Sequence, residues 1–397
     1  MRRSKLLAAM TAAALFATVL AGCSGKDSSS GETNTSKTEE NTVKIIALTS
    51  ENVKLVGRTW LAGDGTLWTA LSGTGIAFDY TGKKLDLTLT GDSSATAGND
   101  TNYARVAVYV DGARVADELM NQPEKQISAF TADAAKTVHV EVVKLSETAM
   151  STVGIKPITI AGGESIVPQA AKAHKIEIIG DSITCGYGVD DEVKEHHFST
   201  ATEDFTKSYA YKTAQALDAD YSAFSISGYG IISGYTGNGT KVEAQTIPQY
   251  YNALGFSYNQ FAGTNAPQAL TWDFTAFQPE AIVINLGTND ATYTGSDLDK
   301  RDEYCAAYIE FLKQVREKNP NAKIFCTLGI MGNSLFTSIE EAVLKYTEAT
   351  GDENIATVQF QAQDGSLGYA ADWHPTEATH EKAAEFLTEQ IKTAMGW

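Results

Sequence analysis

Cysteine is scarce in this chain of 397 residues, which contains only Cys23, Cys185, Cys305 and Cys326. So few thiols over such a length do not form a disulfide framework, and no CxxC pair or histidine and cysteine cluster has the spacing of a metal site. Cys326 lies in an apolar run, where a free cysteine packs as a small hydrophobic residue. The sequence therefore predicts no metal ion and no other cofactor.

Positive charge is also in short supply. Lysine and arginine together number 31 against 49 aspartates and glutamates, which gives a formal net charge of -18 at pH 7. An acidic surface repels phosphate backbones, so nucleic acid and anionic polymers are not expected as partners. The acidity names no substrate, because a solvated and repulsive surface is its usual meaning.

Long hydrophobic runs are missing except near the first residue. Basic residues precede an apolar stretch from Leu6 to Leu20, which is too short for a comfortable membrane span. A basic head, a short apolar stretch and small residues after it are typical of a secretory signal, which we predict at residues 1–22. Residues 24–42 contain no large apolar side chain and cannot offset their ordering entropy, so residues 23–42 are predicted to be a flexible tether.

The end of the apolar stretch indicates where the protein works. Its last four residues, Leu20-Ala21-Gly22-Cys23, resemble the bacterial lipobox, in which the cysteine becomes the lipidated first residue. The alternative is an ordinary signal peptide followed by an incidental cysteine. Lipidation at Cys23 implies an extracellular protein that is anchored to the bacterial cell surface and contacts the membrane through its lipid alone.

Residues 43–170 contain short stretches in which apolar and polar residues alternate. Turn signals such as Thr81-Gly82-Lys83 and Asp111-Gly112 separate them. The clearest stretches are residues 75–80, 85–89, 104–110 and 137–143. Period-two patterning at this spacing, without a convincing helix, predicts an all-β sandwich of antiparallel strands.

Beyond residue 171 the pattern alternates between strands and helices. The apolar runs expected to be strands are residues 175–179, 221–226, 281–286 and 323–328. Between them, one helical pattern places Tyr304, Tyr308, Phe311, Leu312 and Val315 on one face, and a second begins after a possible cap at Thr376. The alternation predicts an α/β domain with a parallel sheet and helices on both faces, whose site opens at the carboxyl ends of the strands.

Three of these strand ends carry residues suited to chemistry. Ser182 follows the first strand, Gly228 the second and Asn289 the third, so the parallel sheet should bring them to one edge. His374 differs from the other five histidines because an acid, Asp372, lies just before it and a proline follows it.

Taken in order, these blocks resemble the motifs of the SGNH hydrolases, a family also described as GDSL-like. The blocks are Gly180-Asp181-Ser182-Ile183, Ser227-Gly228, Gly287-Thr288-Asn289-Asp290, and a late Asp and His before Pro. Four ordered blocks are more specific than any one of them. The resemblance covers about residues 174–397.

A β-sandwich before such a domain, together with Asp372-Trp373-His374, makes the chain similar to carbohydrate esterase family two. The resemblance implies a jelly-roll domain at residues 43–170, a flavodoxin-like SGNH hydrolase domain at residues 171–397, and removal of acetyl groups from plant polysaccharides.

Ester hydrolysis needs a nucleophile, a base and fixed donors for the negative oxygen of the tetrahedral intermediate. We predict that Ser182 is the nucleophile and His374 the base. The backbone N–H groups of Ser182 and Gly228 and the side-chain amide of Asn289 are the predicted oxyanion donors.

The predicted third member of the catalytic triad is Asp372. In the wider SGNH hydrolase family the acid usually stands three residues before the histidine, whereas here Asp372 stands two residues before His374. In an extended segment residues two apart point to the same side with about 6.6 Å of rise between them, so a contact needs a local bend. The alternative is a backbone carbonyl that orients the imidazole and leaves a Ser–His dyad.

Substrate recognition is predicted from the aromatic residues near these motifs. Tyr187, Tyr229, Tyr235 and Trp373 stand close in sequence to the catalytic positions, where their rings could stack on a sugar. Core packing is the alternative for each. The expected partner is an acetylated polysaccharide or oligosaccharide, and the protein is expected to be a monomer.

Three functions remain open from the sequence. The favoured function is a secreted serine acetylesterase of the acetylxylan esterase type, acting on xylan or glucomannan. The second keeps the serine mechanism but acts on a lipid, a thioester or a peptidoglycan acetyl group. The third is an inactive surface lipoprotein that binds glycans, which the intact Ser182, Asn289 and His374 disfavour.

Overall fold

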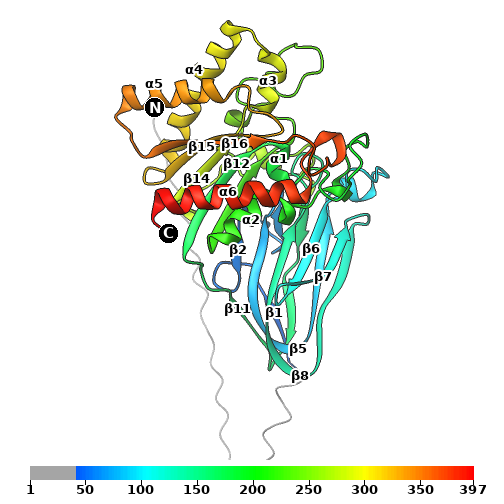
Figure 1. Ribbon diagram of the computed structural model, residues 1–397. Coiled ribbons are helices and arrows are strands. Elements are labelled where there is room, and N and C mark those ends of the chain that lie inside the picture. Colours follow the sequence, from blue (N-terminus) through cyan, green and yellow to red (C-terminus); the bar gives the residue numbers. More distant parts are fainter. Residues whose placement is uncertain (1–41) are drawn as a thin grey trace, which may run out of the picture. The chain divides into compact units, whose positions relative to one another are not determined.

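The structure is a computed structural model and describes residues 42–397 (Figure 1). The expected signal peptide at residues 1–22, the lipidation site at Cys23 and the tether up to residue 41 lie outside the described residues. Within the described range, no helix is both long enough and apolar enough to cross a membrane.

The first half of the described chain consists of antiparallel strands. They are β1 (Val43–Ile46), β2 (Lys54–Val56), β3 (Thr59–Leu61), β4 (Leu67–Thr69), β5 (Gly75–Gly91), β6 (Arg105–Val110), β7 (Ala113–Leu119), β8 (Glu124–Lys144), β9 (Val153–Ile155), β10 (Ile158–Ala161) and β11 (Ser165–Pro168). The larger sheet has the order β3-β4-β9-β5-β8-β6-β7, with β2 and β11 also paired to β5, and β1 pairs with β10. Alternation creates the core, since Leu85, Leu87 and Leu89 are fully buried while the residues between them are partly exposed.

One expected turn of this half is wrong. Thr81-Gly82-Lys83 lies inside β5, which pairs with β8 on both sides of Gly82 and shifts register there. A Cβ built on Gly82 would lie 2.1 Å from the Tyr80 hydroxyl, so the glycine makes room for a side chain within a strand. The expected turn at Asp111-Gly112 joins β6 and β7, and both residues have positive φ.

The second half contains a five-stranded parallel sheet of order β13-β12-β14-β15-β16. Its strands are β12 (His174–Gly180), β13 (Ala219–Ser225), β14 (Ala281–Asn285), β15 (Lys323–Ile330) and β16 (Ile355–Ala362). The four expected strands are confirmed to within two residues at each boundary. The edge strand β16 was not predicted, because its residues Gln359 and Gln361 are exposed and break the apolar run.

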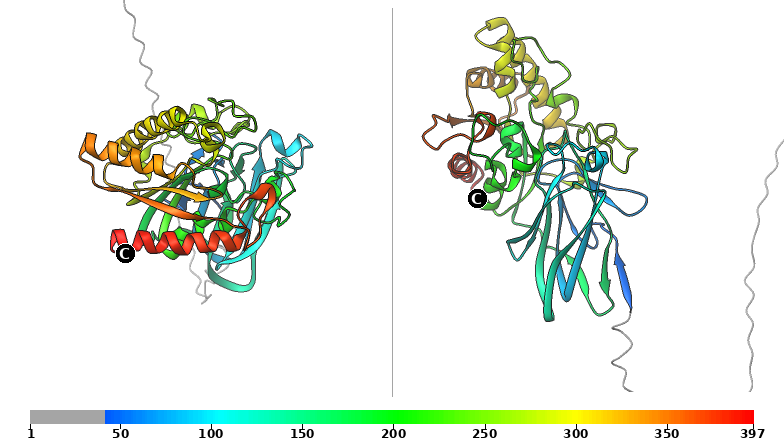
Figure 2. Two further views of the ribbon diagram at one scale, coloured as in Figure 1. Left: turned by 45° about the horizontal axis from the view of Figure 1, so that its top comes forward. Right: turned by 90° about the vertical axis from the view of Figure 1, so that its right-hand side faces the viewer.

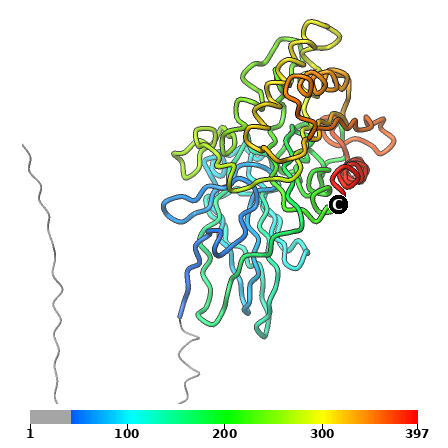
Figure 3. Tube along the Cα trace, turned by 90° about the vertical axis from the view of Figure 1, so that its left-hand side faces the viewer, coloured from blue at the N-terminus to red at the C-terminus, as the bar shows by residue number. Residues whose placement is uncertain are grey.

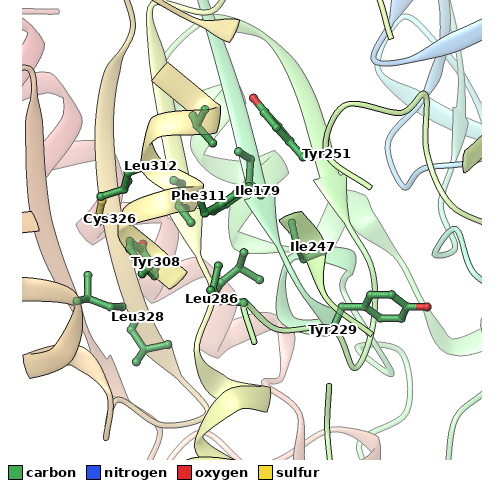
Figure 4. Close-up of a cluster of buried hydrophobic side chains, with 14 of the residues drawn as sticks. Ile179, Tyr229, Ile247, Tyr251, Leu286, Tyr308, Phe311, Leu312, Cys326 and Leu328 are labelled. Atoms are coloured by element: carbon green, nitrogen blue, oxygen red, sulfur yellow. The ribbon is translucent and has the colours of Figure 1, made fainter. Parts of the chain in front are cut away.

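Helices cover both faces of this sheet, as predicted. The helices are α1 (Ser182–Cys185), α2 (Tyr209–Ala216), α3 (Thr288–Thr294), α4 (Leu298–Lys318), α5 (Phe336–Thr350) and α6 (Glu377–Met395). Figure 2 shows α4 and α5, in yellow and orange, across the sheet from α6 in red. The expected apolar face of α4 is buried, and Figure 4 shows Tyr308, Phe311 and Leu312 packed beside Leu328 of β15. The fold class is therefore confirmed: an antiparallel β region precedes a parallel α/β region.

Figure 3 traces the chain from the antiparallel half, in blue to green, to the α/β half, in green to red. Buried and partly buried ion pairs join the two halves. The pairs are Arg58–Glu177, Arg105–Asp190 and Arg114–Asp204, with N–O distances of 3.0, 2.6 and 2.6 Å. From residue 42 onward the contacts of the chain form one compact unit. The division into two domains near residue 170 stays a prediction.

Candidate active site

Ser182 stands where β12 turns directly into α1. Asp181 caps the helix, because its Oδ1 accepts the Ile183 N–H at 3.0 Å. Ser182 is the first residue of α1, so its N–H has no partner within the helix and faces outward with the positive end of the helix. Gly180 permits the tight junction, since a Cβ there would lie 2.0 Å from Thr184 Oγ1. The junction presents a hydroxyl and a backbone donor at the carboxyl edge of the sheet.

His374 comes from the far end of the chain and contacts this hydroxyl. Its Nε2 lies 2.9 Å from Ser182 Oγ, and both residues are only 8% exposed. Burial lowers the pKa of His374 to about 4, so the imidazole is neutral at neutral pH. A neutral imidazole in contact with a serine hydroxyl is the arrangement that general-base catalysis requires.

The expected contact between the Asp372 carboxylate and His374 is not formed. The two carboxylate oxygens instead accept from the Tyr187 hydroxyl at 2.6 Å and pair with His197 Nδ1 at 2.8 Å. His374 Nδ1 lies 3.1 Å from the Ala371 carbonyl and 3.2 Å from the Asp372 carbonyl. Because both partners are acceptors, Nδ1 carries the proton, and Nε2 is left free to accept the proton of Ser182.

The geometry of residues 370–374 explains this outcome. A two-residue spacing brings the carboxylate toward the histidine only in an extended segment, but Asp372 has a φ of 49° and Trp373 a φ of 64°. Two consecutive left-handed residues turn the chain so that carbonyls rather than the carboxylate face the imidazole. Such conformations cost about 1–3 kcal/mol each and persist where neighbouring contacts hold them.

Contacts from three segments hold this turn. The Ala370 N–H donates to the His374 carbonyl at 2.8 Å, and the Asp372 N–H donates to the His196 carbonyl at 2.9 Å. Gln363 Nε2 donates to the Trp373 carbonyl at 2.7 Å. Gln363 also lines a cavity of about 480 Å³ between β16 and α6. Gln363 was not predicted from the sequence, because no neighbouring residue marks it as a hydrogen-bond partner of a turn ten residues away.

Tyr187 packs against the catalytic imidazole. Its ring is stacked on that of His374, with centroids 3.9 Å apart and an interplanar angle of 22°. Burial and the neighbouring Asp372 raise the pKa of the Tyr187 hydroxyl, which therefore stays protonated as a donor to that carboxylate. Asp372 thus acts on His374 through Tyr187 and through its own carbonyl.

The predicted oxyanion donors lie around the same strand ends. Gly228 has a φ of 79°, and its N–H has no hydrogen-bond acceptor among residues 42–397. Asn289 Nδ2 donates to the Tyr229 carbonyl at 2.9 Å and to Asp181 Oδ2 at 3.3 Å, which places its amide beside the nucleophile junction. The roles of these groups as oxyanion donors stay predictions.

Two buried acids, Asp181 and Asp290, fix the backbone around the site. Asp290 accepts the N–H groups of Ile231, Ile232 and Ser233, and its desolvated carboxyl has a pKa raised to about 6. Burial likewise raises the pKa of Asp181 to about 7. Both acids order the backbone that carries the predicted catalytic groups.

The candidate sugar-binding rings divide by exposure. Trp373 is 50% exposed and Tyr235 62% exposed, and Lys194 Nζ lies 4.2 Å from the Trp373 ring. Tyr229 is buried against Phe256, with centroids 5.4 Å apart, and Tyr187 is covered by its contact with His374. Of these four rings, only those of Trp373 and Tyr235 are open to a substrate, whereas those of Tyr187 and Tyr229 are packed against neighbouring side chains.

The structure offers neither a reactive thiol at Cys185 nor, among the described residues, a metal-binding group. Cys185 is fully buried, and burial raises the pKa of its thiol well above the ordinary value. Across residues 42–397, no group of three or more His, Cys, Asp or Glu side chains is arranged to hold a metal ion.

Comparison with known proteins connects this geometry to a family. Residues 178–382 match the GDSL-like Lipase/Acylhydrolase family, and residues 55–169 match the carbohydrate esterase 2 N-terminal family. The chain is 30% identical over 332 residues to the cellulase/esterase CelE of Acetivibrio thermocellus, covering 83% of this chain and 38% of that protein. It therefore spans well under half the length of that relative.

Two further relatives match over most of their lengths. An acetylxylan esterase / glucomannan deacetylase of Cellvibrio japonicus is 26% identical, covering 89% of this chain and 91% of that protein. The solved structure of an acetyl xylan esterase from the rumen bacterium Butyrivibrio proteoclasticus superposes with a TM-score of 0.80 at 25% identity, covering 90% of this chain and 99% of that one. The chain therefore belongs to the GDSL-like lipase/acylhydrolase family, within carbohydrate esterase family two.

Proposed function

We propose that this protein is a carbohydrate O-acetylesterase that removes acetyl groups from plant polysaccharides such as xylan or glucomannan by a serine mechanism. The observation that carries the proposal is the 2.9 Å contact between Ser182 Oγ and a neutral His374 Nε2. The names of the relatives, acetylxylan esterase and glucomannan deacetylase, support the choice of substrate.

The mechanism has two halves. Ser182 Oγ attacks the acetyl carbonyl carbon while its proton passes to His374 Nε2, and the carbonyl oxygen becomes negative. The N–H groups of Ser182 and Gly228 stabilise that oxygen, and so does the amide of Asn289, which exchanges its 3.3 Å hydrogen bond to Asp181 Oδ2 for one to the oxygen. The carbon–oxygen bond to the sugar then breaks, and the proton on Nε2 goes to the leaving sugar oxygen, which leaves an acetyl group on Ser182.

The second half repeats these steps with water. His374 Nε2 takes a proton from water as it attacks the acetyl–enzyme, and the proton returns to Ser182 Oγ when acetate leaves. During both halves the Ala371 and Asp372 carbonyls hold the Nδ1 proton and keep the imidazole in the required tautomer. The exposed ring of Trp373 next to His374 offers a flat surface on which a sugar can stack.

Acetate release from three polymers tests the proposal. The purified chain is incubated in parallel with acetylated xylan, acetylated glucomannan and O-acetylated peptidoglycan, with and without a chelator. We expect acetate from the plant polymers, no effect of the chelator, and no release by Ser182→Ala. Acetate from peptidoglycan alone would indicate an esterase that acts on peptidoglycan acetyl groups. In a second assay with p-nitrophenyl esters, a preference for long-chain over acetyl esters would indicate a lipid substrate. A folded wild-type protein without activity would indicate a glycan-binding protein.

We also propose that Cys23 is lipidated and holds the enzyme at the bacterial cell surface as a monomer. The lipobox-like residues before Cys23 support the anchor. In the native bacterium, the wild-type chain should sediment with membranes and Cys23→Ser should be released to the medium. Equal distributions of the two would contradict the anchor.

A further inference from the structure

A loop of the antiparallel half enters the α/β half beside Gly228. It follows β8, spans residues 145–152, and is buried from residue 145 to residue 149. The Thr148 hydroxyl donates to the Phe256 carbonyl, and the Ala149 carbonyl accepts the Tyr258 N–H at 2.9 Å. The loop is therefore fixed to the α/β half through its own backbone and side chains.

Glu147 of this loop binds the residue that precedes a predicted oxyanion donor. Its Oε2 accepts the Ser227 N–H at 3.1 Å. On the other side, the Gly228 carbonyl accepts the Tyr235 N–H at 2.8 Å. The Gly228 N–H thus lies between two anchored backbone groups, and Glu147 supplies the first of them from the antiparallel half.

Glu147 is itself held in place. Its N–H donates to Glu203 Oε2 at 2.8 Å, and its carbonyl accepts from Lys144 Nζ at 2.6 Å. All three side chains are at most 1% exposed. Burial raises the pKa of both carboxyls and lowers the pKa of Lys144 to about 8. Burying three ionisable groups lowers the stability of the fold relative to an apolar cluster of the same size. Buried groups with shifted pKa values are found most often at functional sites.

We propose that Glu147 is a positioning residue of the active site, fixing the Ser227–Gly228 backbone so that the Gly228 N–H points to the oxygen of the tetrahedral intermediate. This inference rests on the proposed serine mechanism and deepens it. It makes the antiparallel half part of the catalytic site through the backbone that Glu147 orders.

Variants of Glu147 test the proposal through kcat and KM with p-nitrophenyl acetate, a substrate that needs no glycan recognition. Glu147→Ala removes the acceptor, and Glu147→Asp withdraws it by one methylene while keeping the buried carboxyl. The second variant decides if the first does not fold. We expect kcat to fall by about tenfold to a hundredfold, with KM within about twofold, because a displaced donor is lost mainly in the transition state. Glu147→Gln still offers an oxygen to Ser227 and should keep at least about a third of the wild-type kcat.

Thr148→Val is the matched control. Thr148 is the next residue of the loop and is equally buried, and its hydroxyl bonds the Phe256 carbonyl rather than Ser227, so the variant loses one hydrogen bond of the loop. We expect a lower melting temperature with an unchanged kcat. A wild-type kcat in folded Glu147→Asp or Glu147→Ala, or an equal loss in Thr148→Val, would overturn the proposal. Ser182→Ala in the same assay separates this outcome from failure of the serine mechanism, since activity surviving in that variant would refute the mechanism itself.

Discussion

Ser182 and His374 approach each other from backbone segments of opposite kinds. Ser182 stands at a junction where β12 ends and a helix capped by Asp181 begins, and no non-glycine residue of this junction has a positive φ. His374 follows two consecutive left-handed residues that are held by hydrogen bonds from several segments. The junction exposes a nucleophile, whereas the strained turn exposes two carbonyls to the imidazole.

This difference shows how a base can be oriented without a carboxylate. Carbonyl oxygens accept a hydrogen bond from the Nδ1–H group and so fix the tautomer, but they carry no full charge that would stabilise an imidazolium. The low pKa of His374, about 4, agrees with a buried imidazole that lacks a carboxylate contact. We therefore expect substitution of Ser182 to abolish activity, and substitution of the Asp372 carboxylate to change activity little.

The largest effect is expected at the junction. Ser182→Ala removes the nucleophile and should lower kcat with p-nitrophenyl acetate by about 10⁴-fold or more, without loss of folding. Circular dichroism provides the folding control. Turnover close to wild type in this variant would refute the assignment of the nucleophile.

The sequence was sufficient for this side of the comparison. Local rules alone predict that the run from residue 175 to 179 is a strand that leads directly into Gly180-Asp181-Ser182. The same local rules placed Thr376 at the start of α6, where its hydroxyl accepts the Thr379 N–H. Convergence at one sheet edge then followed from the parallel order of the strands.

The other side was beyond local rules. The left-handed angles of Asp372 and Trp373 depend on Gln363 and His196, which are distant from the local pattern of the turn. The link from Glu147 to Ser227 crosses 80 residues and two halves of the chain. Contacts of this kind depend on how elements meet in space, and a single sequence does not encode them as a pattern.

Asn289 should show the next largest effect. Asn289→Ala removes an amide donor beside the junction, and loss of one oxyanion donor costs about 10²- to 10³-fold in kcat. KM should change little, because the donor acts mainly on the intermediate. A kcat within about threefold of wild type would remove Asn289 from the oxyanion hole.

The pH profile reports on the imidazole at the turn. Catalysis needs neutral His374, and because burial lowers its pKa to about 4, the neutral form predominates above that pH. We expect kcat/KM to fall as the pH drops through about 4, about tenfold per unit below it, while the protein remains folded by circular dichroism. A midpoint near 6.5 would mean that the imidazole is exposed or paired with a carboxylate.

A smaller effect is expected at Tyr187. Tyr187→Ala removes the ring that is stacked on His374 and should lower kcat by about tenfold, since a loosened base is poorly aligned. Tyr187→Phe keeps the ring and should remain near wild type. Equal losses in the two variants would show that the hydroxyl, and with it the Asp372 carboxylate, is the important partner.

The smallest effect is expected for the acid of the turn, and Asp372→Asn is the most direct test of the account. Asparagine tolerates the left-handed conformation, so the two carbonyls that face His374 stay in place. His197→Ala, which breaks the exposed contact of the carboxylate, is the matched control. We predict a kcat/KM within about threefold of wild type for Asp372→Asn; a loss of about 10⁴-fold, as when the acid of a serine triad becomes an amide, would contradict a base that is oriented by backbone carbonyls.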